Sequence, residues 1–446
     1  MRKYKSITVG LIITVLISAV SFYSQRKVIE DKVYSKNELQ EDFLQAVEAI
    51  KTYHSNFYIK EEQLDSYAKE YIDAIVDDDV LFFSRILSEF LEKIGCGHSY
   101  IELSGRNQKK YFEIESHHIP LDLFVVNDKL FVKKSVSTAS IPVGAEILSI
   151  NGLSGKAIIE TLLNRIGSDG RNKAFKYAQM STIFSWVYFD LVDNQDKYQV
   201  TYKTKDNQIV IEEIEAVSRQ ALNVLLNYGD MDAESIGIEF FDTYAVLTID
   251  HFNYYKPNER QVFYEKLDAF FSDVDALGLK NLILDIQEND GGDPFSANYL
   301  YSYISPNSYQ YFSKKKSYHD WYHSLYLSAE PKKNNFKGNI YTLTGGRVFS
   351  TGAHLASLIK QNNIGPLIGS ETGGSYRCSS YAQKIVLRNT NLKLIISTKI
   401  YETLSSKLKE VYTITPDYVV NKTVSETVKG INMARMKAII LISQQY

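Results

Sequence analysis

Apolar residues recur along this chain with two different periods, and the changes of period predict its elements. Between about residues 36 and 94, apolar positions such as Phe43, Val47 and Ile50 are spaced three or four apart among charged residues, which predicts a small helical domain. Between about residues 118 and 217, short apolar runs alternate with turns, which predicts a β domain interrupted by a helix over residues 156–165.

Strands and helices alternate in the last third of the chain, and such alternation builds a parallel sheet. Two further runs of alternating apolar and polar residues predict an antiparallel hairpin. The expected fold class is therefore α/β. The predicted strands are 244–249, 281–286, 340–343 and 366–368, the predicted helices are 260–271, 296–303 and one from residue 350 onward, and the hairpin runs are 382–388 and 392–401.

The unit from Asn339 to Gly374 reads as strand, glycine turn, helix and strand, and Ser350 stands where the helix begins. Ligands bind parallel sheets at the carboxyl ends of the strands, where helix N-termini present free N–H groups. Two interpretations of Ser350 are open. It is a helix N-cap, the commonest task of serine before a helix, or a nucleophile that needs a base, an orienting group and an oxyanion hole elsewhere.

His98 is the best candidate base among the eight histidines. It follows Gly97 on a turn at the end of the helical region, where its side chain can project into a cleft; the alternative is a surface histidine. His251 and His354 suit local roles. The other five lie in polar stretches and are expected to be solvated: His54, His117, His118, His319 and His323.

The segment LILDIQENDGGD, residues 282–293, is an apolar strand that ends in a glycine pair before a helix. Glycine permits positive φ and close backbone approach, so a main-chain N–H there can face a developing oxyanion. An ordinary strand-to-helix turn explains the pattern equally well.

Composition narrows the function classes. A length of 446 residues allows two or three domains, and a net charge of −3 gives no sign of nucleic-acid binding. Cys96 and Cys378 are the two cysteines, and no Cys/His cluster has metal-ligand spacing, so neither a zinc site nor a disulfide framework is indicated. Whether the two cysteines pair is left open.

The N-terminus has the pattern of an export signal. Basic residues precede an uncharged apolar run over residues 7–23, after which polar residues return. Small residues from Ala19 to Ser21 favour cleavage, although an uncleaved membrane anchor through 7–23 stays open. We expect an exported, periplasmic or otherwise extracytoplasmic protein.

Taken in order, these motifs resemble the tail-specific, or C-terminal-processing, serine peptidases, whose catalytic core also occurs in tricorn protease. The resemblance rests on GHS at 97–99, the 282–293 segment, the Ser350 unit ending in GSETGG, and KEVYTITPDYVV at 409–420. It implies a crotonase/Clp-protease-like βαβ core, an N-terminal helical domain and an inserted PDZ-like β domain. PVGAEILSING at 142–152 resembles the late part of a PDZ domain, with a purely structural β domain as an equal alternative. The expected boundaries are 1–27 for the signal or anchor, 28–105, 106–226 and 227–446.

The family's site occurs in two versions, and the resemblance implies the tricorn-like one. The Ser/Lys version places a lysine shortly after the G(E)xTxG run. In this chain the first lysine after that run is Lys384. The tricorn-like version corresponds to Ser350 as nucleophile, His98 as base and Glu410 as the group that orients the base. Backbone N–H groups then form the oxyanion hole, and no metal or organic cofactor is needed. The N–H donors would be those of Gly291 and Thr351.

The chain departs from the family pattern in three places. Glu288 and Asp290 stand where glycines are common, Gly97 replaces a serine before the histidine, and Thr413 replaces a glycine. We expect an exported serine endopeptidase that acts on protein or peptide substrates. The alternatives are an inactive relative that binds peptides or a hydrophobic ligand, and an esterase.

Overall fold

The computed structural model describes residues 32–54, 59–114, 116–135, 141–226, 235–313, 322–403 and 412–445. The expected export signal and Glu410 both lie outside these ranges. Among the described residues, no helix combines the length and the apolar character that a membrane crossing needs.

The four strands predicted in the C-terminal part lie side by side and parallel, and two strands that were not predicted, β8 and β17, extend them to a six-stranded sheet. Its order is β17-β14-β13-β10-β9-β8, and all neighbours are parallel except β8 and β9. The strands are β8 (Ile236–Phe240), β9 (Ala245–Ile249), β10 (Asn281–Asp285), β13 (Asn339–Thr344), β14 (Leu367–Gly369) and β17 (Tyr418–Val419).

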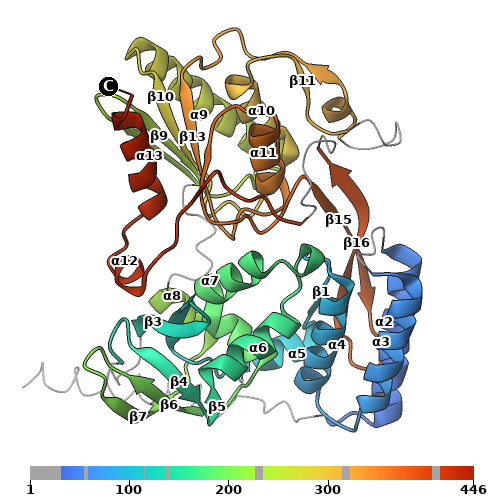
Figure 1. Cartoon of the computed structure of the whole chain (residues 1–446). Helices are drawn as coiled ribbons and strands as arrows, with labels where there is room; N and C mark the ends of the chain where they lie inside the picture. The colour runs from blue at the N-terminus through green and yellow to red at the C-terminus, as the bar shows by residue number, and fades with distance from the viewer. Residues whose placement is uncertain are drawn as a thin grey trace, which may run out of the picture.

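Helices cover both faces of this sheet (Figure 1). Successive strand residues point to opposite faces, so Leu282 and Leu284 join the core under three helices, while Ile283 faces the fourth. The first three are α9 (Pro257–Ala276), α10 (Pro294–Ile304) and α11 (Ser350–Gln361), and the fourth is α13 (Met433–Ser443).

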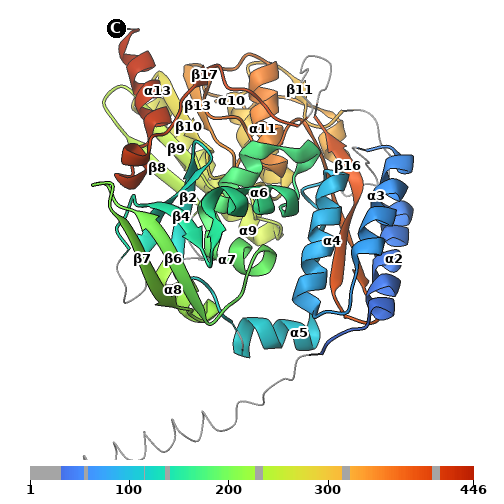
Figure 2. The same cartoon turned by 60° about the horizontal axis from the view of Figure 1, so that its bottom comes forward.

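The predicted N-terminal helices are present, and they pack against the predicted hairpin from the other end of the chain (Figure 2). Phe43 and Phe90 share one core with Leu392 and Leu394. The hairpin strands pair antiparallel, and a strand after the helices pairs with the second of them. These elements are α2 (Lys36–Tyr53), α3 (Glu61–Ala74), α4 (Val80–Ile94), β1 (Tyr100–Glu102), β15 (Arg377–Val386) and β16 (Lys393–Glu402).

The middle region is an antiparallel sheet in the order β2-β3-β4-β6-β7, packed against helices. The predicted helix is α6 (Gly155–Arg165), but α7 (Lys173–Leu191) was not predicted. Its apolar residues lie on several sides, and a break at Ile183 (φ −133°) interrupts the helical spacing. The other elements are β2 (Leu121–Val126), β3 (Lys129–Ser135), β4 (Glu146–Ile150), β5 (Leu153–Ser154), β6 (Lys197–Lys203), β7 (Ile209–Glu215) and α8 (Arg219–Leu226). Short elements complete the chain: α5 (Gly105–Lys109), η1 (Lys110–Ile114), η2 (Asp169–Arg171), β11 (Tyr309–Gln310), η3 (His323–Tyr326), β12 (Ser328–Ala329) and α12 (Val424–Val428).

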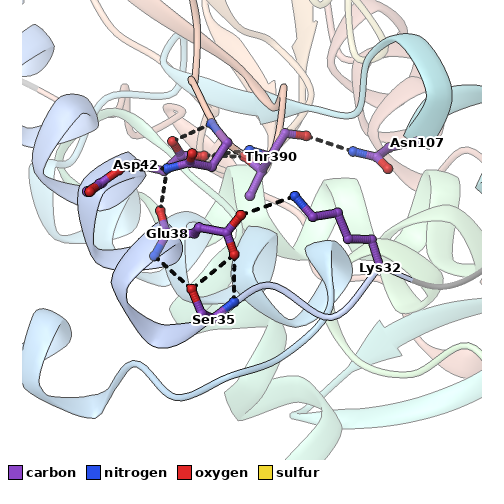
Figure 3. A network of polar contacts seen from close by, with 8 residues as sticks. Lys32, Ser35, Glu38, Asp42, Asn107 and Thr390 are labelled. Carbon is purple, nitrogen blue, oxygen red and sulfur yellow. Dashed lines mark hydrogen bonds and ion pairs between the residues drawn. The ribbon is translucent and has the colours of Figure 1, made fainter.

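A buried carboxylate joins helix α2 to the tip of the hairpin (Figure 3). Asp42 on α2 is fully buried, and its two oxygens accept hydrogen bonds from the N–H of Asn389 (2.9 Å), the N–H of Thr390 (2.8 Å) and the Thr390 hydroxyl (2.6 Å). Asn107 donates in turn to the Thr390 carbonyl at 2.8 Å. A single carboxylate therefore satisfies two backbone N–H groups of the turn.

Asp42→Ala should destabilise this part of the protein, because the amides of Asn389 and Thr390 would lose their acceptor in a buried place. The expected cost is about 2–4 kcal/mol. Hydrogen exchange at these two amides, together with the urea midpoint, measures it. Glu48→Ala removes an exposed carboxylate from the same helix and should leave both unchanged. Equal behaviour of the two variants would contradict the structural role of Asp42.

Candidate active site

Three hydrophobic cores meet at the turn that precedes α11. Val348 and Ala353 belong to the core of the parallel sheet, whereas Phe349, between them in sequence, belongs to the core of the middle region. Cys96, two residues before His98, belongs to the core of the N-terminal helices. The packing of all three regions therefore places the residues around Ser350.

Ser350 has a strained backbone and contacts the predicted base. Its φ is +50°, a conformation that costs a non-glycine residue on the order of 1–3 kcal/mol. Its Oγ lies 3.1 Å from Nε2 of His98. Phe349 occupies the N-cap position without a side-chain cap bond, so the interpretation of Ser350 as an N-cap is wrong.

The His98 ring is held by Phe349 and by the backbone of its own turn. The two rings stack with centroids 4.6 Å apart. A Cβ on Gly97 would lie 2.7 Å from the Phe349 ring, so the stacking requires glycine at the position where the family pattern has serine. The Gly97 N–H donates to buried Asp169 at 2.8 Å, which fixes the residue before the imidazole.

Burial keeps the His98 imidazole neutral, because it lowers the pKa of His98 to about 4. A neutral imidazole can accept a proton from Ser350. Its Nδ1 is buried and has no hydrogen-bond partner among the described residues. Glu410, predicted to hold this nitrogen, lies outside them; the described chain resumes at Tyr412, whose ring packs on Gly170.

The glycine pair predicted to border the oxyanion hole lies against the turn. Gly291 has φ +111°, and a Cβ there would lie 2.7 Å from Cβ of Ser350 and 3.1 Å from N of Thr351. Thr351 donates its hydroxyl to the Gly292 carbonyl at 2.7 Å, and its N–H is among the first of α11, which have no acceptor within a helix. The Gly291 N–H, by contrast, donates to the side chain of Asn289 at 3.1 Å.

Asn289 is a structural residue of the site that the sequence did not single out. It is fully buried, its amide nitrogen donates to the Ile249 carbonyl at 3.0 Å, and its backbone carbonyl accepts the Phe349 N–H at 3.1 Å. A Cβ on Gly352 would lie 2.5 Å from its side-chain oxygen. Asn289 thus ties the glycine pair to the Ser350 turn. Its position two residues before that pair was the available signal.

The two carboxylates that depart from the family pattern share one cationic partner. Nη2 of Arg347 lies 3.0 Å from Asp290, and Nε lies 3.5 Å from Glu288. The guanidinium offsets part of their negative potential beside the turn. Thr413, which replaces a glycine of the family pattern, also has a local partner. Its hydroxyl donates to the Thr372 carbonyl at 2.9 Å.

The structure corrects part of the histidine assignment. His54 and His118 are buried rather than solvated, and burial lowers the pKa of each to about 4. His117 is partly exposed and lies 2.7 Å from Asp196, while His319 is outside the described residues. His354 is also buried, and both cysteines are free thiols.

Comparison with known families and structures identifies one family model. Residues 243–420, which include the five parallel strands of the sheet, Ser350 and Glu410, match the model described as Peptidase family S41. No curated protein sequence matches the chain significantly.

Solved structures share the fold at low sequence identity. Mature CPAF complexed with lactacystin aligns with a TM-score of 0.68 and 12% identity over 91% of this chain and 98% of that one. A second structure, of mature CPAF, aligns with a TM-score of 0.65 and 11% identity over 91% of this chain and 96% of that one. The photosystem II D1 C-terminal processing protease aligns with a TM-score of 0.46 and 13% identity over 88% of this chain and 96% of that one. This similarity is too weak to support an inference.

Asn289→Ala should loosen the Ser350 turn, because the Ile249 carbonyl and the Gly291 N–H would both lose a buried partner. We expect a loss of about 1–3 kcal/mol in the free energy of unfolding. Urea denaturation followed by tryptophan fluorescence measures it. Glu288→Ala, at the neighbouring and more exposed position, is the matched control. A midpoint for Asn289→Ala equal to that of the control would show that Asn289 does not hold the turn.

Proposed function

We propose that this chain, of which residues 243–420 match the model of peptidase family S41, is a serine peptidase that hydrolyses peptide bonds through an acyl-enzyme formed on Ser350. The observation that carries this proposal is the 3.1 Å contact between Ser350 Oγ and His98 Nε2, made by residues 252 positions apart in the chain. A serine hydroxyl is a weak nucleophile at its own pKa and needs such a base.

The reaction follows from the positions of these groups. Ser350 Oγ attacks the substrate carbonyl carbon while its proton passes to His98 Nε2. His98 then gives that proton to the leaving amine as the C–N bond breaks. Water enters, loses a proton to His98 and hydrolyses the ester, which releases the carboxylic acid product and restores Ser350.

The tetrahedral intermediate carries a negative oxygen, for which we assign the N–H groups of Thr351 and Gly291. One such donor is worth about 10²–10³ in rate. In the unliganded chain the Gly291 N–H is bonded to Asn289, so its donation to the oxyanion requires that 3.1 Å bond to lengthen or be shared. The Thr351 N–H, at the start of α11, is the better placed of the two.

Glu410 is assigned to the Nδ1 side of His98. A carboxylate there, acting directly or through a hydroxyl, would select the tautomer that leaves Nε2 as acceptor and would stabilise the imidazolium. The support is the buried Nδ1, which has no partner among the described residues, together with the place of Glu410 six residues before Pro416.

The proposed setting is an exported endopeptidase of protein or peptide substrates. Its parts would be a signal or anchor over 1–27, a helical domain over 28–105, a PDZ-like domain over 106–226 and a crotonase/Clp-protease-like core over 227–446. The basic and then apolar N-terminus supports export, and the similarity to mature CPAF supports the arrangement of the core.

The rival proposal of an inactive peptide-binding relative rested on Glu288, Asp290 and Thr413. Arg347 pairs with Glu288 and Asp290, and Thr413 makes a hydrogen bond, so none of these three residues leaves an uncompensated group beside the turn. An esterase would differ from a peptidase in its relative turnover of matched ester and peptide substrates.

Ser350→Ala should abolish both peptide hydrolysis and covalent labelling by a fluorophosphonate probe, since both need the same Oγ. Peptide turnover and in-gel fluorescence measure the two effects. Ser370→Ala, an exposed serine in the loop after β14, should keep both. Peptidase activity that survives Ser350→Ala would overturn the assignment, and a wild-type protein that is neither labelled nor active would favour the inactive relative.

The pH dependence of peptide hydrolysis tests the role proposed for Glu410 as the partner of His98. His98 must be neutral to act, so activity falls as pH drops through its pKa. Burial alone lowers that pKa to about 4, and a nearby carboxylate raises it because it favours the charged imidazolium. The acid limb of kcat/KM should therefore lie between about 4 and 6.5 in the wild type. Glu410→Gln should shift it down toward about 4 and reduce kcat about tenfold or more.

The matched control for that variant is Glu371→Gln, an exposed carboxylate in the loop after β14. It should leave the acid limb in place. A limb that stays unchanged in Glu410→Gln would exclude this residue as the partner of His98.

A further inference from the structure

A cavity of about 640 Å³ lies between the N-terminal helices and the middle region, and Ser350 is not among its lining residues. Figure 2 shows the elements that frame it, with α4 on one side, α7 and α8 on the other, and α5 crossing between them. Such a volume is in the range of small-molecule sites, about 300–1,000 Å³. The mechanism above does not use this space.

Apolar side chains from four elements line the cavity, so an apolar molecule gains free energy by leaving water for it. They are Leu81 on α4, Ile101 on β1, Phe112 on η1, and Ile183 and Val187 on α7. Gly97 and Ser99, on either side of His98, also line the cavity. A bound molecule would therefore contact the turn that carries the base.

Arg219, the first residue of α8, brings a positive charge to this apolar wall. Its guanidinium carbon lies over the rings of Phe112 and Trp186, 4.2 Å and 4.3 Å from their centroids. Its Nη1 is buried and has no hydrogen-bond partner among the described residues. The rings attract the charge but do not replace an acceptor oxygen, and a buried donor without an acceptor is costly. An oxygen of a ligand would remove that cost.

The other two cations of the cavity wall are already paired. Nε of Arg165 lies 3.2 Å from Glu89, and Nζ of Lys393 lies 3.8 Å from Glu102. Within the described part of the chain, Arg219 is therefore the cation that lines the cavity without a carboxylate at ion-pair distance.

Asp190 on α7 also lines the cavity, and its charge attracts the Arg219 guanidinium, although its oxygens make no hydrogen bond to Nη1. Burial raises the pKa of Asp190 to about 6, while Arg219 and Arg85 oppose this rise. At neutral pH Asp190 is thus mostly ionised, and its charge opposes the binding of an anion to Arg219. Removal of that charge should strengthen anion binding.

We propose that the cavity binds a small monocarboxylate with an apolar body. Its carboxylate accepts hydrogen bonds from the Arg219 guanidinium, and its apolar part lies against α4, η1 and α7. A guanidinium presents paired N–H donors that match the two oxygens of a carboxylate. The proposal is independent of peptide hydrolysis, because neither Arg219 nor Asp190 belongs to the Ser350 site.

Isothermal titration calorimetry on the full-length protein tests this proposal. The probes are 4-phenylbutyrate and decanoate, together with 4-phenylbutyramide, which lacks the charge, and acetate, which lacks the apolar body. The wild type is compared with Arg219→Gln, Asp190→Asn and Val187→Trp, which remove the cation, remove the negative charge and fill the apolar space. Arg388→Gln, at an exposed arginine between β15 and β16, is the matched control. A melting curve of each variant reports whether it is folded.

We expect the wild type to bind at least one of the two apolar acids with a Kd below about 1 mM, and 4-phenylbutyramide and acetate at least about tenfold more weakly than that acid. Arg219→Gln should weaken binding of the acid about tenfold or more, and Asp190→Asn should strengthen it about three- to tenfold. Val187→Trp should abolish binding, and Arg388→Gln should leave it unchanged. Hydrogen exchange of residues 97–103 should slow in the complex.

The inference is overturned if the wild type binds neither acid, if 4-phenylbutyramide binds as tightly as the acids, or if Arg219→Gln keeps the wild-type affinity. Binding that persists in folded Val187→Trp would place the ligand elsewhere and would overturn it too. Asp190→Asn keeps the test decisive where Arg219→Gln does not fold, because an affinity that fails to rise would contradict a carboxylate at this position.

Discussion

The contact between Phe349 and His98 is the interaction on which the candidate site depends. Phe349 stacks on the imidazole and also packs on Phe175, within the core of the middle region, while its own backbone begins the helix that carries Ser350. One ring therefore connects the base, the nucleophile and a sheet that supplies neither of them. Gly97 is the condition for this contact, because any side chain there would occupy the space of the Phe349 ring.

Burial sets the protonation states of the titratable groups at this site as well as their positions. Burial lowers the pKa values of His98 and His354, which keeps both imidazoles neutral, and raises the pKa of the Cys378 thiol, which stays protonated. A neutral base beside a serine hydroxyl is the state from which proton transfer can start. The same burial imposes a cost on folding in acid. An unfolded histidine takes up a proton near pH 6.5, whereas the folded one resists it down to about 4, so stability is lost as pH falls across that interval.

The residues that differ from the family pattern are each matched by a local partner. Arg347 lies between Glu288 and Asp290, Thr413 bonds the loop after β14, and Gly97 makes room for Phe349. Asn289 adds a constraint of the same kind, since it joins the glycine pair to the Ser350 turn through side-chain and backbone hydrogen bonds. A substitution at one of these positions is therefore expected to disturb a contact between elements rather than an isolated side chain.

The order and type of most elements were predictable from the sequence, because apolar periodicity reports which face of a helix or strand is buried. The parallel sheet, the N-terminal helices, the β15–β16 hairpin and the Ser350 turn are examples. Helix α7 was not predictable, since burial on several sides and the break at Ile183 remove its period. The burial of His54 and His118 and the roles of Asn289 and Arg347 depend on packing between residues far apart in the chain. Only the tertiary structure decides such contacts, because local patterns encode the faces of an element but not the side chains that will meet them.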